Sequence, residues 1–373
     1  MKKLPNLDIL RLFLACAVVL FHIPVTMDSL GFNVSVPLAI FKKGDEAVSF
    51  FFTLSGFLIL RLLFIEKTEQ GNINIRDFYI RRVLRISPLY YLILLAGFVL
   101  YHVLLPVAGL GKPPDYSTGS MLAHFTLLAP NVFIFSHKVG PILHVLWSIG
   151  VEEQFYLFAP LFIFLIPKNR LVAGLGMLLA ISLVLCLGSE FLYRNRMNYY
   201  YFVFGGLISI LSYRYDLRKV FNNPLFRWTV VGLFFLYFFT ELIPLKDETK
   251  RVFAMMLSGL YITKIADYPQ LIISNKRLNY FGRISYGIYM YHFVVLTFLM
   301  GFFRYVIDLR AHSGPLLVAL FTVAALAATV FVSHLSYRYF ESRFIRLKAA
   351  YRPDTPPAAA VPVPATPSGK ELV

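Results

Sequence analysis

Apolar residues recur along this chain in runs long enough to cross a lipid bilayer as helices, and short polar segments separate the runs. A membrane-spanning helix needs about 20 predominantly apolar residues to cross a hydrocarbon core of about 30 Å. The pattern predicts ten such helices, near residues 7–26, 47–65, 84–106, 143–166, 171–189, 199–213, 228–244, 252–267, 284–303 and 315–337. We therefore expect an all-α fold, a polytopic transmembrane helical bundle. Two of the runs, 199–213 and 252–267, are short enough to be tilted, broken or interfacial helices.

Two segments depart from this pattern. Residues 106–141 are polar and turn-rich and then mildly apolar, which predicts a folded external loop with a surface helix that could bind an acceptor. From residue 349 the sequence is rich in Pro and Ala. We therefore expect a membrane domain of residues 1–348 and a disordered cytoplasmic tail of residues 349–373.

Basic residues are distributed unequally between the two sides of the predicted bundle. Cytoplasmic loops of membrane proteins carry an excess of Lys and Arg. If the N-terminus is cytoplasmic, 24 of the 36 Lys and Arg residues lie on that side and 11 on the other, with Arg11 inside the first run. Both termini are therefore predicted to be cytoplasmic.

Composition excludes several classes of protein. Hydrophobic residues make up 58% of the 373 residues and charged residues only 15%, whereas soluble domains keep about a quarter of their residues charged. The net charge of +16 lies in short clusters beside apolar runs, which is typical of topology signals and anionic-lipid contacts rather than nucleic-acid binding. Cys16 and Cys186 lie inside apolar runs, so we expect packing residues and no metal site. A cleaved signal peptide is not expected, because Asp8, Arg11 and His22 interrupt the first run.

The first apolar run contains an arginine and a histidine at helical spacing. Arg11 and His22 are eleven residues apart, so they share one helix face and lie about 16 Å apart along its axis. Ionisable residues inside a membrane are costly and normally face a bundle interior or a wet cavity. A neutral imidazole could there accept a proton from a hydroxyl that attacks an activated carbonyl. A core histidine bonded to a neighbouring helix is the alternative.

The second run is rich in phenylalanine and contains two small residues, Ser55 and Gly56. Small residues let another helix approach closely in a membrane. Helix packing therefore explains this segment on its own.

Three arginines, Arg81, Arg82 and Arg85, precede the third run. Arg82 and Arg85 are neighbours on one helix face, and forked guanidinium groups bind phosphate in a bidentate manner. A cytoplasmic anchor of the helix explains the same residues equally well.

Two adjacent carboxylates, Glu152 and Glu153, lie in the fourth run, shortly after Ser148. Adjacent residues on a helix point about 100° apart, so the two cannot share one partner. We expect one of them to meet an arginine or histidine of another helix, in a functional site or in a structural ion pair.

The ninth run carries a polar stripe. Ser285, Tyr289 and His292 lie on one side of the expected helix, and Tyr286 follows Ser285 directly. Substrate contact and helix packing explain this stripe equally well.

Taken in order, these segments resemble the motifs of the membrane-bound acyltransferase 3 family, bacterial integral-membrane proteins that O-acylate surface and exported sugars. The resemblance covers nearly all of residues 6–345. The matching motifs are R-x10-H at Arg11 and His22, the phenylalanine-rich segment ending in S-G-F at Phe51–Phe57, F-Y-x-R-R-x-x-R-I-x-P at Phe78–Pro88, W-S-L-x-V-E-E-Q-F-Y at Trp147–Tyr156 with Ile149 in place of Leu, and S-Y-x-I-Y-x-x-H at Ser285–His292.

The resemblance implies specific roles for these residues. It implies that His22 is essential as the general base, that Arg11 lies close to the donor or its phosphates, and that Arg82 and Arg85 hold the coenzyme A portion of acyl-CoA presented from the cytoplasm. Further candidates are Glu152 and Glu153 in catalysis, Arg81 in donor binding, and Ser55, Gly56, Ser148, Tyr286, Tyr289 and His292 in substrate contact or motif structure.

The resemblance also implies an activity and a location. We expect an O-acetyltransferase of the bacterial inner membrane that uses acyl-CoA, most commonly acetyl-CoA, and a carbohydrate or glycolipid acceptor without a metal. Some family members carry a C-terminal esterase-like domain. The tail here is short and rich in proline, so we expect transfer within the membrane domain or with a separate partner.

Two other classes of protein could use the same buried polar residues. A transporter or flippase of an acyl donor or lipid-linked sugar would use them as a pathway, but its usual paired half-sequences are not evident. A sensor or scaffold would tolerate their joint replacement by apolar residues.

Overall fold

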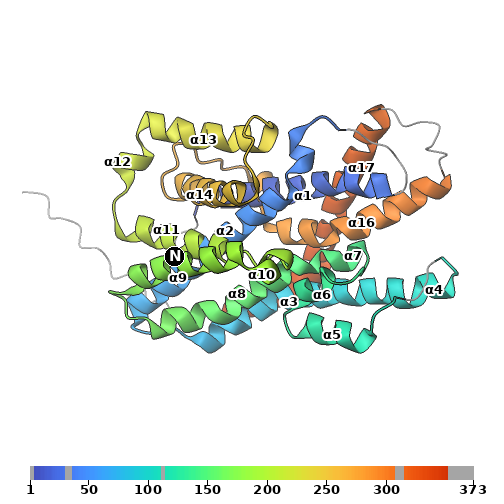
Figure 1. Ribbon diagram of the computed structural model, residues 1–373, viewed down its shortest axis with the longest axis horizontal. Coiled ribbons are helices and arrows are strands. Elements are labelled where there is room, and N and C mark those ends of the chain that lie inside the picture. Colours follow the sequence, from blue (N-terminus) through green and yellow to red (C-terminus); the bar gives the residue numbers. More distant parts are fainter. Residues whose placement is uncertain (1–3, 30–35, 111–113, 307–314, 352–373) are drawn as a thin grey trace, which may run out of the picture.

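The computed structural model describes residues 4–29, 36–110, 114–306 and 315–351, and these ranges are helical with no strand (Figure 1). The long helices are α1 (Leu7–Ser29), α2 (Gly44–Gln70), α3 (Ile75–Val99), α8 (Leu146–Leu165), α9 (Leu171–Gly188), α11 (Tyr200–Arg214), α13 (Pro224–Phe239), α14 (Asp247–Ala266), α16 (Ser285–Val306) and α17 (Pro315–Ser336). The short ones are η1 (Ala39–Lys42), η2 (Leu100–Leu104), α4 (Leu105–Val107), α5 (Thr118–Thr126), α6 (Pro130–Ile134), α7 (Pro141–His144), α10 (Glu190–Arg194), α12 (Arg218–Phe221), α15 (Lys276–Arg283), η4 (Tyr337–Glu341), α18 (Ser342–Leu347) and η5 (Lys348–Tyr351).

Each of the ten predicted runs coincides with a helix, and seven of these helical segments are long and apolar enough to cross a membrane. The other three are α11, with 15 residues, α13, with 16, and α14. α14 begins with the strongly polar segment Asp247–Arg251, which lowers the hydropathy of its first turns. The multi-pass all-α fold is thus confirmed, whereas ten spans and cytoplasmic termini remain predictions.

The segments outside the runs also contain helices. The expected surface helix of the loop is divided into α5 and α6. Of the expected tail, residues 349–351 belong to η5, and residues 352–373 lie outside the described residues.

Local sequence signals explain where several helices begin and end. The side chain of Asn74 accepts a hydrogen bond from the backbone N–H of Asp77, which caps α3. Asn223 caps α13 in the same way, with Pro224 in the first helical position. α2 ends at Gly71, whose φ of +80° is readily adopted by glycine and is strained for other residues.

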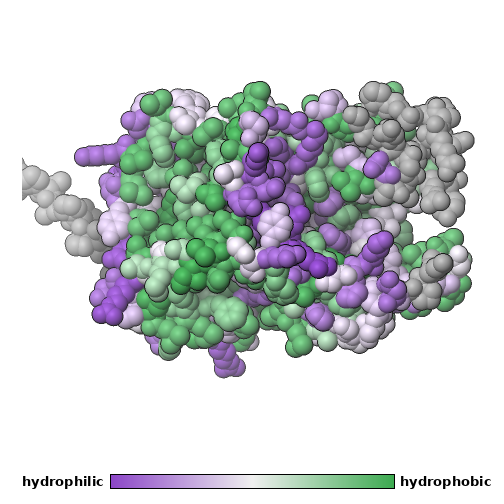
Figure 2. Space-filling view, in the orientation of Figure 1, coloured by the Kyte–Doolittle hydropathy of each residue, from purple (hydrophilic) through white to green (hydrophobic). Residues whose placement is uncertain are grey.

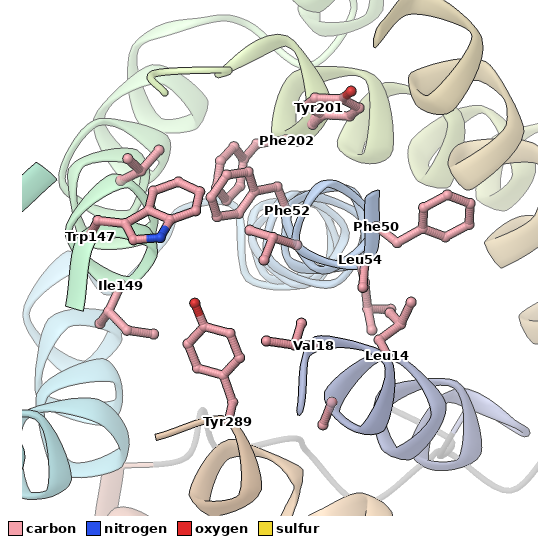
Figure 3. Packing of buried hydrophobic residues seen from close by; sticks show 14 of the residues in the cluster. Leu14, Val18, Phe50, Phe52, Leu54, Trp147, Ile149, Tyr201, Phe202 and Tyr289 are labelled. Atoms are coloured by element: carbon pink, nitrogen blue, oxygen red, sulfur yellow. The ribbon is translucent and has the colours of Figure 1, made fainter. Parts of the chain in front are cut away.

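α2 is the central helix of the bundle and packs against α1, α8, α11 and α14. Figure 3 shows α2 among these neighbours, with Phe52 beside Phe202 of α11 and Trp147 of α8. The Phe52 and Phe202 rings are stacked, with their centroids 4.6 Å apart. The core therefore surrounds the helix that carries the phenylalanine-rich segment.

Glycines allow α2 and α11 to cross with their backbones in contact. A Cβ at Gly56 would lie 1.9 Å from the carbonyl oxygen of Phe202, and one at Gly205 would lie 2.1 Å from that of Thr53. Such contacts are possible only for residues without a side chain. The structure therefore assigns Gly56 to helix packing.

Candidate functional site

A cavity of about 220 Å³ lies between α1, α2, α3, α8 and α16; we call it the first cavity. Figure 3 shows four of its lining residues, Tyr289, Ile149, Phe52 and Leu54, beside α2. Its polar lining is Arg11, Ser55, Arg82, Arg85, Ser148, Glu152, Tyr156, Ser285, Tyr286 and Tyr289. All five sequence motifs thus contribute residues to the first cavity, and the motif that contains His22 contributes Arg11 alone.

Three guanidinium groups make one part of the first cavity strongly cationic. Arg11 of α1 and Arg82 and Arg85 of α3 all line it, whereas Glu152 is the carboxylate among the lining residues. Arg11 Nη1 is held 3.2 Å from Asp8 Oδ1 of the preceding turn. The remaining positive charge in a largely buried space favours an anion with several oxygens, such as a phosphate.

The two adjacent glutamates have different surroundings. Ser55 Oγ donates a hydrogen bond of 2.6 Å to Glu152 Oε1, and the hydroxyl of Tyr156 donates to the same oxygen. Glu153 does not line the first cavity, and its buried Oε2 has no hydrogen-bond partner. The prediction that the two side chains diverge is confirmed. A direct ion pair is not found for either glutamate among the described residues. Glu152 accepts from hydroxyl groups and lines the first cavity together with Arg82 of another helix, as expected for one of the two.

A hydrogen bond and aromatic contacts connect the first cavity to the predicted histidine. Ser148 Oγ and the Tyr289 hydroxyl are 2.5 Å apart and hydrogen-bonded. Tyr289 contacts His292, whose ring lies nearly parallel to that of His22, with centroids 5.1 Å apart. His22 also packs on Phe293, at 4.3 Å between centroids. His22 therefore lies beyond Tyr289, outside the residues that line the cavity itself.

Each of the two imidazoles has one buried ring nitrogen without a hydrogen-bond partner. His292 Nδ1 bonds to the carbonyl oxygen of Tyr289, and its Nε2 is buried without a partner. His22 Nδ1 is likewise buried without a partner, although the residue is partly exposed. A neutral imidazole with a free nitrogen can accept a proton.

Other candidates have structural contacts. Arg81 points away from the first cavity, because its Nη2 lies 3.4 Å from Glu66 Oε2 and its Nη1 donates to the carbonyl oxygen of Tyr351. The Tyr286 hydroxyl donates to the carbonyl oxygen of Ile86. Tyr286 lines the cavity while it joins α16 to α3.

Two residues of the site were not proposed as site residues from the sequence. Tyr156 closes the hydrogen-bond cluster around Glu152, and Asp8 holds Arg11. Asp8 and Tyr156 could have been found as the polar residues one helical turn from Arg11 and Glu152. Groups of His, Cys, Asp and Glu that could hold a metal ion do not occur in the part of the chain that the structure describes.

Comparison with known proteins adds a family match over nearly the whole chain. The sequence model of the acyltransferase 3 family, described as an acyltransferase domain, matches residues 4–338. O-acetyltransferase OatA of Staphylococcus aureus strain NCTC 8325 is 24% identical over 367 residues, which cover 91% of this chain and 57% of that protein. Peptidoglycan O-acetyltransferase OatA of Listeria monocytogenes is 26% identical over 378 residues, which cover 91% of this chain and 56% of that protein. The chain thus spans little more than half of these relatives. No solved structure matches it.

Proposed function

This chain belongs to the acyltransferase 3 family, and on that premise we propose that it is an O-acetyltransferase that transfers an acetyl group from acetyl-CoA to a carbohydrate hydroxyl. The observation that carries the proposal is the first cavity. It holds three guanidinium groups and leads through Ser148 and Tyr289 toward His292 and His22.

The cationic part of the first cavity fits the phosphates of coenzyme A. Arg82 and Arg85 project from one face of α3, and Arg11 faces them from α1. Together they offer forked donors to several phosphate oxygens. The rise of about 16 Å between Arg11 and His22 along α1 leaves room for the extended pantetheine arm between the phosphates and the reacting thioester.

His22 is the proposed general base. The acceptor hydroxyl oxygen attacks the thioester carbonyl carbon while an imidazole nitrogen takes the hydroxyl proton. The new C–O bond forms, the C–S bond breaks, and the coenzyme A thiolate leaves with the proton from the imidazolium. His292, stacked on His22, fixes the plane of the catalytic ring. The products are the O-acetyl sugar and free coenzyme A.

We also propose an orientation of this cavity in the membrane. We place the arginine end at the cytoplasmic face of the bacterial inner membrane, where acyl-CoA is made, and the His22 end toward the opposite face. The excess of Lys and Arg on the side of both termini supports this orientation. A sugar or glycolipid acceptor outside the cytoplasm could thus receive an acetyl group made inside.

His22→Ala tests the proposal. Cells that express the full chain or the variant are compared by mass spectrometry of their surface glycans, where each acetyl group adds one fixed mass increment. Removing a general base lowers the rate by about 10²- to 10⁴-fold, so the acetyl mass shift should disappear.

A matched control separates loss of the base from loss of folding. His137 is an exposed histidine outside the first cavity, so His137→Ala should keep the acetyl shift. Both variants should reach the membrane at the same level. Full acetylation by His22→Ala would refute its role as base, and flipping of a lipid-linked sugar without any acetyl transfer would refute the enzyme assignment.

A further inference from the structure

A second cavity of about 420 Å³ lies where the first turns of α2 and α14 meet the segment around α10; we call it the second cavity. Charged residues line it: Asp45, Glu46, Arg194, Arg196, Asp247, Lys250 and Arg251. Figure 2 shows hydrophilic side chains gathered at the centre of this face, in the region where Figure 1 places α10 and the starts of α2 and α14, with apolar surface beside it. The mechanism above uses none of these charged residues.

The second cavity adjoins the first at two aromatic residues, Phe52 and Trp147. Phe52 lines both cavities, as does Val48, and Trp147, which lines the second cavity, directly precedes Ser148, which lines the first. The Phe52 and Trp147 rings meet edge to face at 6.2 Å between centroids. On α2 the second cavity is lined by residues between Asp45 and Phe52 and the first by residues between Val48 and Leu62, so the two cavities follow one another along the helix axis. A ligand in one can therefore approach a ligand in the other at this aromatic pair.

The second cavity also lies beside the proposed base. A Cβ at Gly44 would lie 2.4 Å from the ring of Phe21, so the first turn of α2, which carries Asp45, packs directly on the residue before His22. Phe293, which contacts His22, also contacts His144 from α7, and His144 contacts Phe135 of the second cavity.

The lining combines aromatic faces with fixed charges. Arg196 pairs with Asp45 at 2.8 Å, and Lys250 pairs with Glu46 at 2.5 Å. Such ion pairs leave further donor and acceptor sites for sugar hydroxyls. Trp147 and Tyr201 add apolar surface of the kind on which sugar rings stack. The arrangement suits a polyol better than an apolar chain.

Arg251 gives the second cavity a preference for an anion. Its guanidinium lies 3.9 Å from the ring centroid of Tyr193, which fixes its plane, and its buried Nη1 has no hydrogen-bond partner. The four cationic and three carboxylate side chains of the lining leave one net positive charge. A carboxylate or phosphate oxygen would satisfy the free donor.

We propose that the second cavity binds the acceptor, a saccharide that carries an anionic substituent, with the substituent at Arg251 and the reacting hydroxyl at the Phe52–Trp147 junction. The proposal rests on the O-acetyltransferase function and names its acceptor class. Binding in this cavity and transfer of the acetyl group are separate events, so they can be measured separately.

Tryptophan fluorescence provides a binding measurement that does not depend on catalysis. The chain has two tryptophans, of which Trp147 lines the second cavity and Trp228 is exposed on α13. Trp228→Phe therefore leaves Trp147 as the reporter in the purified full-length protein. The probes are maltotriose, maltotriose phosphate and trigalacturonate, which compare a neutral sugar with phosphate and carboxylate forms.

The anionic probes should quench Trp147 with dissociation constants at least tenfold lower than that of maltotriose. Arg251→Ala should raise the constants for the anionic probes about 10- to 100-fold, because it removes a charge-assisted hydrogen bond, and should leave maltotriose unchanged. Arg251→Lys keeps the positive charge and should recover part of the affinity for the anionic probes. Such recovery would show that the loss in Arg251→Ala does not come from misfolding. Arg218→Ala, at an exposed arginine of α12, is the matched control and should bind as the parent does.

The outcomes distinguish this proposal from the proposed function. No quenching by any probe at about 10 mM, or equal quenching by all three, would overturn the acceptor site even if acetyl transfer is found. Selective quenching that Arg251→Ala abolishes would support the site even if the protein transfers no acetyl group. Equal losses in Arg251→Ala and Arg218→Ala would show a general charge effect and would also overturn it.

Discussion

Arg82→Gln tests the cationic part of the first cavity most directly. The guanidinium of Arg82 lies 5.6 Å from the ring centroid of Phe78 and 5.7 Å from that of Tyr156, so the two rings hold it in place. Its Nε is buried without a hydrogen-bond partner. Glutamine retains much of the stem but carries no charge. The substitution therefore removes the proposed phosphate donor with little change in packing.

The size of the effect follows from one lost hydrogen bond to a charged group. Such bonds contribute about 1.5–3 kcal/mol, which corresponds to a factor of about 10 to 100 in a dissociation constant. We expect coenzyme A to bind Arg82→Gln more weakly by that factor. Arg82→Lys should lose less affinity for coenzyme A, because it keeps the positive charge and loses only the forked donors of the guanidinium group.

Isothermal titration calorimetry with coenzyme A and purified protein measures the effect. Arg76 is an exposed arginine in the first turn of the same helix, so Arg76→Gln removes the same charge outside the cavity. A parent-like constant for Arg82→Gln, or an equal loss in Arg76→Gln, would refute the assignment of the phosphates to the first cavity.

Two further predictions concern the scaffold. Gly56→Ala should destabilise the protein by about 1–3 kcal/mol, because its Cβ would overlap the carbonyl oxygen of Phe202; Gly176→Ala in α9, where nothing lies within 4 Å, should raise or preserve the melting temperature in the same thermal scan. Asp267→Asn should cost about 3–5 kcal/mol in a denaturant titration, because it leaves the charge of Arg61, now paired at 2.7 Å, buried without a counter-charge, and a loss below about 1 kcal/mol would contradict this account.

Much of the fold could be predicted from the sequence, because each helix depends on neighbouring residues. Every apolar run became a helix, and the motif residues Arg11, Arg82, Glu152 and Tyr289 now line one cavity. The three helices that are not long or apolar enough to span a membrane were harder to predict from the sequence. Whether each of these helices crosses the membrane depends on the helices against which it packs. α11, for example, is held against α2 by glycine contacts that the periodicity of the sequence does not reveal.

Within the motifs, spacing could not determine which neighbour faces the cavity. Arg81 and Arg82 are adjacent, yet Arg82 lines the first cavity and Arg81 pairs with Glu66. Glu152 and Glu153 differ in the same way. Adjacent residues on a helix point about 100° apart, so the rotation of each helix in the bundle determines which of the two faces the cavity.

The sequence by itself determined that this chain forms a bundle of apolar helices with costly polar residues at helical spacing, because both properties depend on residues close together in the chain. Only the tertiary structure decided which of those residues meet. It placed His22 on His292, 270 positions later, and it assembled the second cavity from the first turns of α2, α8, α11 and α14 and the segment around α10. The physical reason is that a cavity is the space left between packed helices, and its lining depends on their rotation and crossing.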